Sequence, residues 1–121
     1  MKLKLKLLLL SVIFLMLAVE PTIPAVPSPP TSPNQLILTA LSKSIRLNWT
    51  NRATTAVGYR IFRTTMKVGS QTGKVFPLGA NALQYIDTGL EKSMTYCYCV
   101  VCYNAGGESV PEVCGCAKTL K

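Results

Sequence analysis

The chain contains no histidine in its 121 residues, so it lacks the side chain that most often serves as a general base or a metal ligand. No glycine-rich phosphate-binding motif follows a strand, because Gly106-Gly107 fits a turn better. The acidic residues of the folded part also form no evident catalytic pair; they are Asp87, Glu91, Glu108 and Glu112. We therefore expect a protein that is not an enzyme and that carries no cofactor and no metal ion.

Long apolar runs are equally scarce. The one present, Leu7–Val19, has thirteen residues and is shorter than the roughly 20 that a membrane-spanning helix needs. It follows a basic stretch with three lysines, so it predicts a secretory signal peptide over residues 1–25. Cleavage is expected after Ala25, with Ala18 as an alternative. An uncleaved N-terminal anchor is the other interpretation, and both predict a protein that is secreted, periplasmic or held at the cell surface.

Acidic residues are few, with five against 13 basic ones. Removing residues 1–25 would leave ten basic and four acidic residues, and such a positive excess favours anionic partners. The basic residues are spread along the sequence without a cluster, which favours a solvated surface, and we do not expect nucleic acid as a partner. They are Lys43, Arg46, Arg52, Arg60, Arg63, Lys67, Lys74, Lys92, Lys118 and Lys121.

Proline, by contrast, is concentrated in one place. Pro21–Pro33 holds six prolines in thirteen residues, a composition that cannot bury a core and favours an extended, partly polyproline II conformation. We interpret residues 26–33 as a linker and residues 34–121 as one folded domain, which is all that this length allows.

Within the predicted domain, short segments alternate between apolar and polar residues, the period of a strand with one buried face. The clearest alternation runs through Ile45, Leu47 and Trp49, with polar residues between them. No helical periodicity is present, and turn residues separate the segments at regular intervals. The sequence therefore predicts an all-β sandwich.

All five cysteines lie in two predicted strands on either side of the Gly-Gly turn. In the first strand Cys97 and Cys99 point to one side, whereas Cys102 shares the other side with Tyr96 and Tyr98. Because that tyrosine side faces the core, we predict that Cys102 is a buried free thiol. The other four cysteines then remain for pairing.

A hairpin centred on Gly106-Gly107 predicts which cysteines pair. It sets Cys99 opposite Cys114 and Cys97 opposite Cys116, within the range that a cross-strand disulfide tolerates. A zinc site built from the same four thiolates is the main alternative, although structural zinc sites generally use Cys-x-x-Cys turns. An oxidising compartment favours disulfides, and no Cys-x-x-Cys motif supports redox catalysis.

Five motifs, taken in order, resemble the fibronectin type III family over roughly residues 30–119. They are Ile45-Arg-Leu-Asn-Trp49, Gly58-Tyr-Arg-Ile61, Tyr85-Ile-Asp-Thr-Gly-Leu90, Tyr96-x-Tyr98-x-Val100 and Asn104-Ala-Gly-Gly-Glu-Ser109. The resemblance implies an antiparallel, immunoglobulin-like sandwich of two sheets and about seven strands. It also implies a tyrosine corner at Leu90 and Tyr96 and a core that contains Trp49, Tyr59, Leu90, Tyr96 and Tyr98.

The same resemblance implies a non-catalytic exported module for binding or adhesion, or a scaffold. Here cross-strand disulfides, which the family normally does not need, would stabilise it. The expected binding loops are residues 51–56, with Arg52 as a polar contact, and residues 105–108, with Glu108. A protein or a carbohydrate would be the partner, membrane contact would need an uncleaved N-terminal segment, and the protein would be a monomer. The alternative function is a small cationic secreted protein that binds anionic polysaccharide or nucleic acid.

Overall fold

The computed structural model describes residues 21–51, 53–65, 73–110 and 113–121. Residues 1–20, which hold most of the predicted signal peptide, lie outside this part, as does Arg52. Within the described ranges, no helix has the length and apolar character needed to span a membrane.

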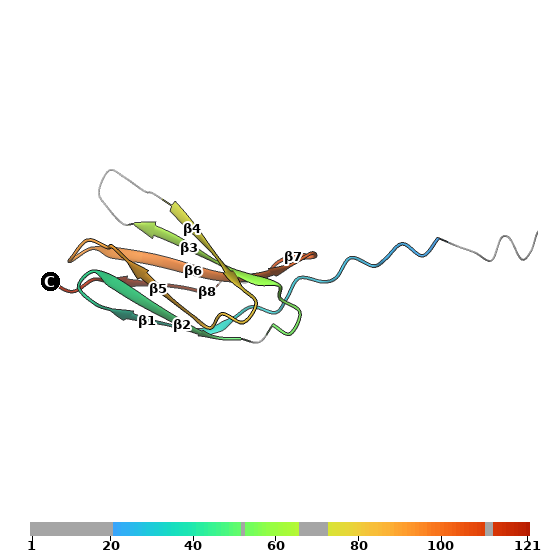
Figure 1. Ribbon diagram of the computed structural model, residues 1–121, viewed down its shortest axis with the longest axis horizontal. Coiled ribbons are helices and arrows are strands. Elements are labelled where there is room, and N and C mark those ends of the chain that lie inside the picture. The colour runs from blue at the N-terminus through green and yellow to red at the C-terminus, as the bar shows by residue number, and fades with distance from the viewer. Residues whose placement is uncertain (1–20, 52, 66–72, 111–112) are drawn as a thin grey trace, which may run out of the picture.

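Eight described strands form two antiparallel sheets that pack face to face (Figure 1). The smaller sheet has the order β1 (Asn34–Ala40), β2 (Ser44–Thr50), β5 (Gln84–Thr88). The larger sheet has the order β4 (Gly73–Gly79), β3 (Gly58–Thr65), β6 (Thr95–Asn104), and β6 also pairs with β7 (Gly107–Glu108) and β8 (Val113–Lys118). The predicted all-β sandwich is confirmed, with eight strands where about seven were expected because the last arm is divided into β7 and β8.

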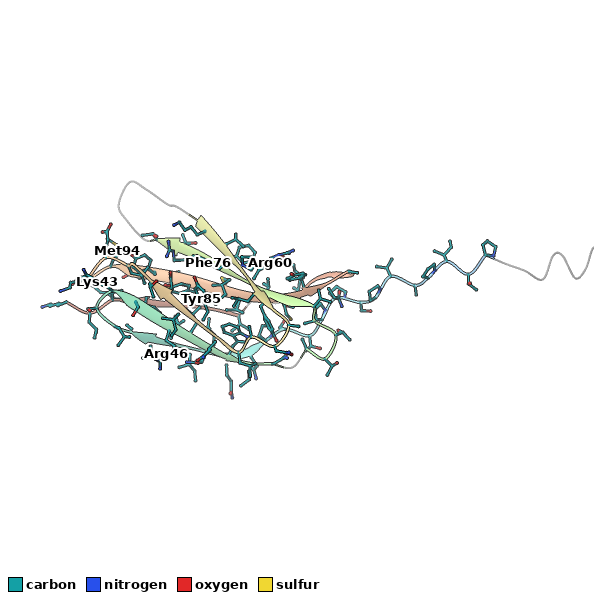
Figure 2. The ribbon with its side chains drawn as sticks, viewed as in Figure 1. Lys43, Arg46, Arg60, Phe76, Tyr85 and Met94 are labelled. Carbon is teal, nitrogen blue, oxygen red and sulfur yellow. A yellow bond between two sulfur atoms is a disulfide. The ribbon has the colours of Figure 1, made fainter. Side chains whose placement is uncertain are left out.

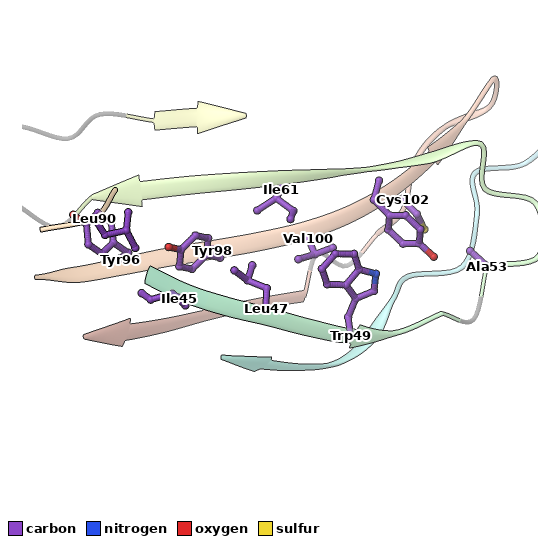
Figure 3. Close-up of a cluster of buried hydrophobic side chains, with 11 residues drawn as sticks. Ile45, Leu47, Trp49, Ala53, Ile61, Leu90, Tyr96, Tyr98, Val100 and Cys102 are labelled. Carbon is purple, nitrogen blue, oxygen red and sulfur yellow. The ribbon is translucent and has the colours of Figure 1, made fainter. Parts of the chain in front are cut away.

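The core lies between the sheets and is built from alternate residues of β2, β3 and β6 (Figure 3). Trp49 of β2 and Tyr59 of β3 meet across the sandwich with ring centroids 5.6 Å apart. Burial of one such aromatic side chain contributes about 1.5–3 kcal/mol to folding. The buried cluster comprises Ile45, Leu47, Trp49, Ala53, Tyr59, Ile61, Leu90, Tyr96, Tyr98, Val100 and Cys102.

The loop that leads from β5 to β6 is fastened to the core by Tyr96. The backbone N–H of Glu91 donates a hydrogen bond of 2.9 Å to the phenol oxygen of Tyr96. Leu90 and Tyr96 are both buried, so the phenol sits inside the sandwich with a backbone partner. This is the arrangement that the tyrosine corner implies.

A buried polar group links the two sheets, and the sequence pattern did not reveal it. Asp87 of β5 accepts hydrogen bonds of 2.7 and 2.9 Å from Nη1 of Arg63 on β3. The phenol of Tyr98 on β6 donates a further bond of 2.8 Å to the same carboxylate. The side chains of Arg63 and Asp87 are only 12% and 4% exposed. Asp87 is therefore a structural ion-pair partner between the sheets.

The environment of Tyr98 makes the stability of the fold decrease at alkaline pH. Burial, followed by the hydrogen bond to Asp87, raises the pKa of Tyr98 far above its ordinary value of about 10. The folded state thus keeps a proton that the unfolded state releases. The stabilisation from this group is complete below about pH 10 and is lost as the pH rises further.

We expect Tyr98→Phe to lower the free energy of unfolding by about 1–3 kcal/mol at pH 7, because Asp87 loses a buried donor. Above pH 10 the wild-type protein should lose stability more steeply than the variant, by up to about 1.4 kcal/mol per pH unit. Urea unfolding at a series of pH values measures both effects. Parallel pH profiles for the two proteins would contradict this role of Tyr98.

Candidate functional site

The four paired cysteines lie on the outer face of the larger sheet, on β6 and β8. Cys97 bonds to Cys116 with an S–S distance of 2.04 Å, and Cys99 bonds to Cys114 at 2.07 Å. Their Cα atoms are 4.0 and 4.1 Å apart, because each pair stands directly opposite in the β6–β8 register. These are the two pairings predicted from the sequence, and they use the four sulfurs that the alternative zinc site requires. The described residues contain no group of three or more potential metal-ligating side chains.

The hairpin itself differs from the prediction. The turn consists of Ala105 and Gly106, because Asn104 pairs with Gly107 and Tyr103 with Glu108. A hairpin continued in this register would place each cysteine two residues away from its observed partner. The register of β8 with β6 differs by two residues from that of β7, and it is the β8 register that matches the disulfides. The predicted pairing is therefore correct although the assumed turn centre is wrong.

The disulfides belong to an apolar row that crosses the outer face. Val75 of β4 pairs with Phe62 of β3, Phe62 pairs with Cys99, and Cys99 pairs with Cys114. Because Tyr59, Ile61 and Arg63 point inward, the alternation of β3 directs Phe62 outward. Val75 is 53% exposed, and Cys114 and Cys116 are exposed. We call Phe62, Val75 and the two disulfides the outer apolar row.

Arg60, which is labelled in Figure 2, contacts a charged side chain and an aromatic ring. Arg60 forms an ion pair with Glu108, and its guanidinium lies 4.0 Å from the ring centre of Tyr103. Val101, which stands opposite Arg60, is fully buried even though its strand position faces outward. Glu108 is thus part of strand β7 and is paired with Arg60, and its role as a polar contact for a partner stays a prediction.

The overall pattern of strands matches known structures. The third fibronectin III domain of human KIAA0343 protein superposes with a TM-score of 0.71 at 17% identity, over 86% of this chain and 93% of that one. A fibronectin type III domain of human collagen XX gives 0.65 at 26% identity, over 81% and 99%. The FN5 domain of Drosophila Lar gives 0.62 at 22% identity, over 76% and 98%. No family model and no curated protein sequence matches this chain.

This is a fibronectin type III fold. The strand orders of both sheets and the Tyr96 contact support the same conclusion from the structure itself. In this chain the fold carries two disulfides on one outer face.

The proline-rich segment makes more contacts with the domain than the sequence predicts. Pro30 and Pro33 are buried, and the side-chain amide of Asn104 donates a 2.7 Å hydrogen bond to the carbonyl of Ser28. The Cys102 thiol lies 3.1 Å from the carbonyl oxygen of Thr31, to which it donates. Residues 27–33 therefore dock against Cys102 and the turn at Ala105 and Gly106. The predicted linker, residues 26–33, thus contacts the domain and leaves this turn partly covered.

Cys102 is the free, buried thiol that the sequence predicts. Ser109 makes two hydrogen bonds to the backbone of Cys102. The Ser109 amide donates to the Cys102 carbonyl at 2.8 Å, and the Ser109 hydroxyl accepts from the Cys102 amide at 3.1 Å. The buried thiol is therefore a packing residue under the docked segment.

The two disulfides should stabilise the domain in a non-additive way. Their loops, with sequence separations of 15 and 19 residues, are nested, so one bond already restricts most of the same unfolded chain. We expect removal of either pair by double Cys→Ala substitution to cost about 2 kcal/mol and removal of both to cost about 5 kcal/mol. Urea unfolding measures these costs. Non-reducing peptide mapping should show the remaining bond, and recovery of five free thiols from the wild-type protein under oxidising conditions would contradict the pairing.

Gly106 should control the docking of the proline-rich segment. A Cβ at this position would clash with the Pro27 carbonyl oxygen, so we expect Gly106→Ala to displace residues 27–29 while both sheets persist. The NMR signal of the Asn104 side-chain amide should then shift, because its bond to Ser28 is lost. The matched control is Gly79→Ala, since nothing lies within 4 Å of a Cβ there. An unchanged Asn104 signal in Gly106→Ala would refute the docking.

Proposed function

We propose that this domain is a non-catalytic, exported protein-binding module and that the outer apolar row is its binding surface. The observation that carries the proposal is the row of Val75, Phe62 and the Cys99–Cys114 disulfide, which are paired side by side across four strands. A sheet face that only meets water normally carries polar residues at these positions. Apolar side chains gathered on an exposed face instead mark a site for interaction.

The disulfides support binding in two ways. They hold β8 against β6, so the outer face is already ordered and less conformational entropy is lost when a partner binds. They also replace polar side chains with sulfur atoms, which offer few hydrogen bonds to a sugar. An apolar surface of this kind therefore favours a protein partner over a carbohydrate. Disulfides also persist in oxidising compartments, which supports export.

The test uses Val75→Glu as bait for crosslinked capture from intact cells that export the protein. Val75 is 53% exposed, so a carboxylate there should leave the fold intact. In a complex the same carboxylate would lose its water, which weakens binding. The matched control is Ile86→Glu, which adds the same charge to the outer face of the smaller sheet at a site that is 45% exposed.

We expect wild type and Ile86→Glu to capture the same partner, and Val75→Glu to bind it at least about tenfold more weakly. Circular dichroism of all three proteins should be the same. Equal capture by Val75→Glu and wild type would reject the outer apolar row as the binding surface. Loss of capture in both variants would point to a nonspecific charge effect and would also reject it.

A further inference from the structure

Lysines that are far apart in the sequence come together at one end of the sandwich. Lys43 lies in the turn between β1 and β2, and Lys92 lies in the loop between β5 and β6. Lys118 ends β8 and Lys121 follows it, and all four are exposed. Figure 1 shows these three segments at one end, while residues 21–33 leave from the opposite end. We call these four residues the lysine end.

Backbone hydrogen bonds fix the three segments to one another. The amide of Leu90 donates to the carbonyl of Lys43 at 3.0 Å, and the amide of Ser93 donates to the carbonyl of Leu120 at 3.2 Å. The amide of Leu120 in turn donates to the carbonyl of Leu41 at 3.0 Å. Lys43 and the neighbouring Met94 appear at this end in Figure 2. The lysines are therefore attached to one rigid surface.

The other described charges do not offset this end. Arg60 and Arg63 are ion-paired with Glu108 and Asp87 respectively, so each of these positive charges is offset by its own partner. Within residues 41–43, 89–94 and 118–121, which are all described, the sequence contributes one acidic side chain, Glu91, against four lysines. The described part has eight basic and three acidic side chains, so three of its five net positive charges lie here, and Arg46 and Lys74 supply the other two. The sequence suggested an even spread because these lysines are separated by up to 78 positions.

Two exposed leucines stand among the lysines. Leu41 and Leu120 are 46% and 54% exposed and are adjacent, since their backbones are hydrogen-bonded. A soluble anionic polymer would be attracted by the lysines but would gain little from the leucines. A lipid bilayer uses both, because lysines contact acidic headgroups while apolar side chains enter the interface. Lysine stems also reach along such an apolar surface while their ammonium groups stay in water.

We propose that the lysine end binds peripherally to a bilayer that contains anionic lipid, with Leu41 and Leu120 in the headgroup–acyl boundary. This contact does not involve residues 1–20 and is separate from the outer apolar row. Because residues 21–33 leave the opposite end of the sandwich, they would point away from the bound membrane (Figure 1). The domain can thus meet a membrane at one end and a protein on its side.

The test is co-sedimentation with lipid vesicles. Residues 21–121 are used, because all described strands, both disulfides and the core lie within this part and residues 1–20 are themselves apolar enough to bind lipid. Vesicles of phosphatidylcholine with about one-quarter phosphatidylglycerol are compared with pure phosphatidylcholine. We expect binding only to the anionic vesicles and its loss when salt rises from about 0.1 M to about 0.5 M. Absence of binding to anionic vesicles at low salt would overturn the proposal.

Two double variants then locate the membrane-binding site. Lys43→Glu with Lys118→Glu should reduce vesicle binding at least about tenfold. Arg46→Glu with Lys74→Glu makes the same change in net charge at exposed positions outside the lysine end and should have a much smaller effect. Equal losses in both double variants would show a diffuse charge effect and would overturn the assignment.

Substitution of the two leucines distinguishes binding to a membrane from binding to an anionic polymer. Leu41→Gln with Leu120→Gln should weaken vesicle binding several-fold while retention on a heparin column stays unchanged. Val57→Gln, at a site that is 61% exposed, is the matched control and should bind vesicles as wild type does. If the leucine variant binds vesicles as tightly as wild type, the lysine end is a polyanion site and the membrane proposal is wrong.

Discussion

The alternation of strand β6 is the constraint on which the rest of the structure depends. One face of β6 supplies Tyr96, Tyr98, Val100 and Cys102 to the core, and the other face supplies Cys97 and Cys99 to the disulfides. Since side chains alternate with a period of two, a slip of one residue would exchange the two faces. Such a slip would bury the cysteines and expose the tyrosines. Burial of the tyrosine face therefore holds the cysteines opposite their partners on β8.

The ion pair between Arg63 and Asp87 adds a different kind of constraint. Burying a charge is costly unless a partner and further hydrogen bonds compensate it, and here Tyr98 supplies one more donor. Loss of one partner would leave a charge buried between the sheets, at a cost of about 3–5 kcal/mol. The group thus fixes how β5 of one sheet faces β3 and β6 of the other, a relation that nondirectional apolar packing specifies less strictly.

The molecule separates its surfaces by chemistry. The larger sheet presents apolar side chains and sulfur, the lysine end presents cations with two leucines, and the turn at Ala105 and Gly106 is partly covered by residues 27–33. In this domain the turn at Ala105 and Gly106 is partly covered by its own chain, so less of its surface is open to a partner than in a turn without such a segment.

The sequence alone determined the sandwich fold and the pairing of the cysteines. The alternation around Trp49 and Tyr98 predicts the sandwich, and the facing of the cysteines predicts their partners, because both depend on short-range periodicity. The tertiary structure decided the rest. The Arg63–Asp87 pair and the gathering of Lys43, Lys92 and Lys118 join residues that are distant in the chain, and β7 and β8 pair with β6 in registers that differ by two residues. Local patterns carry no information on such contacts, because only the folded topology brings these residues together.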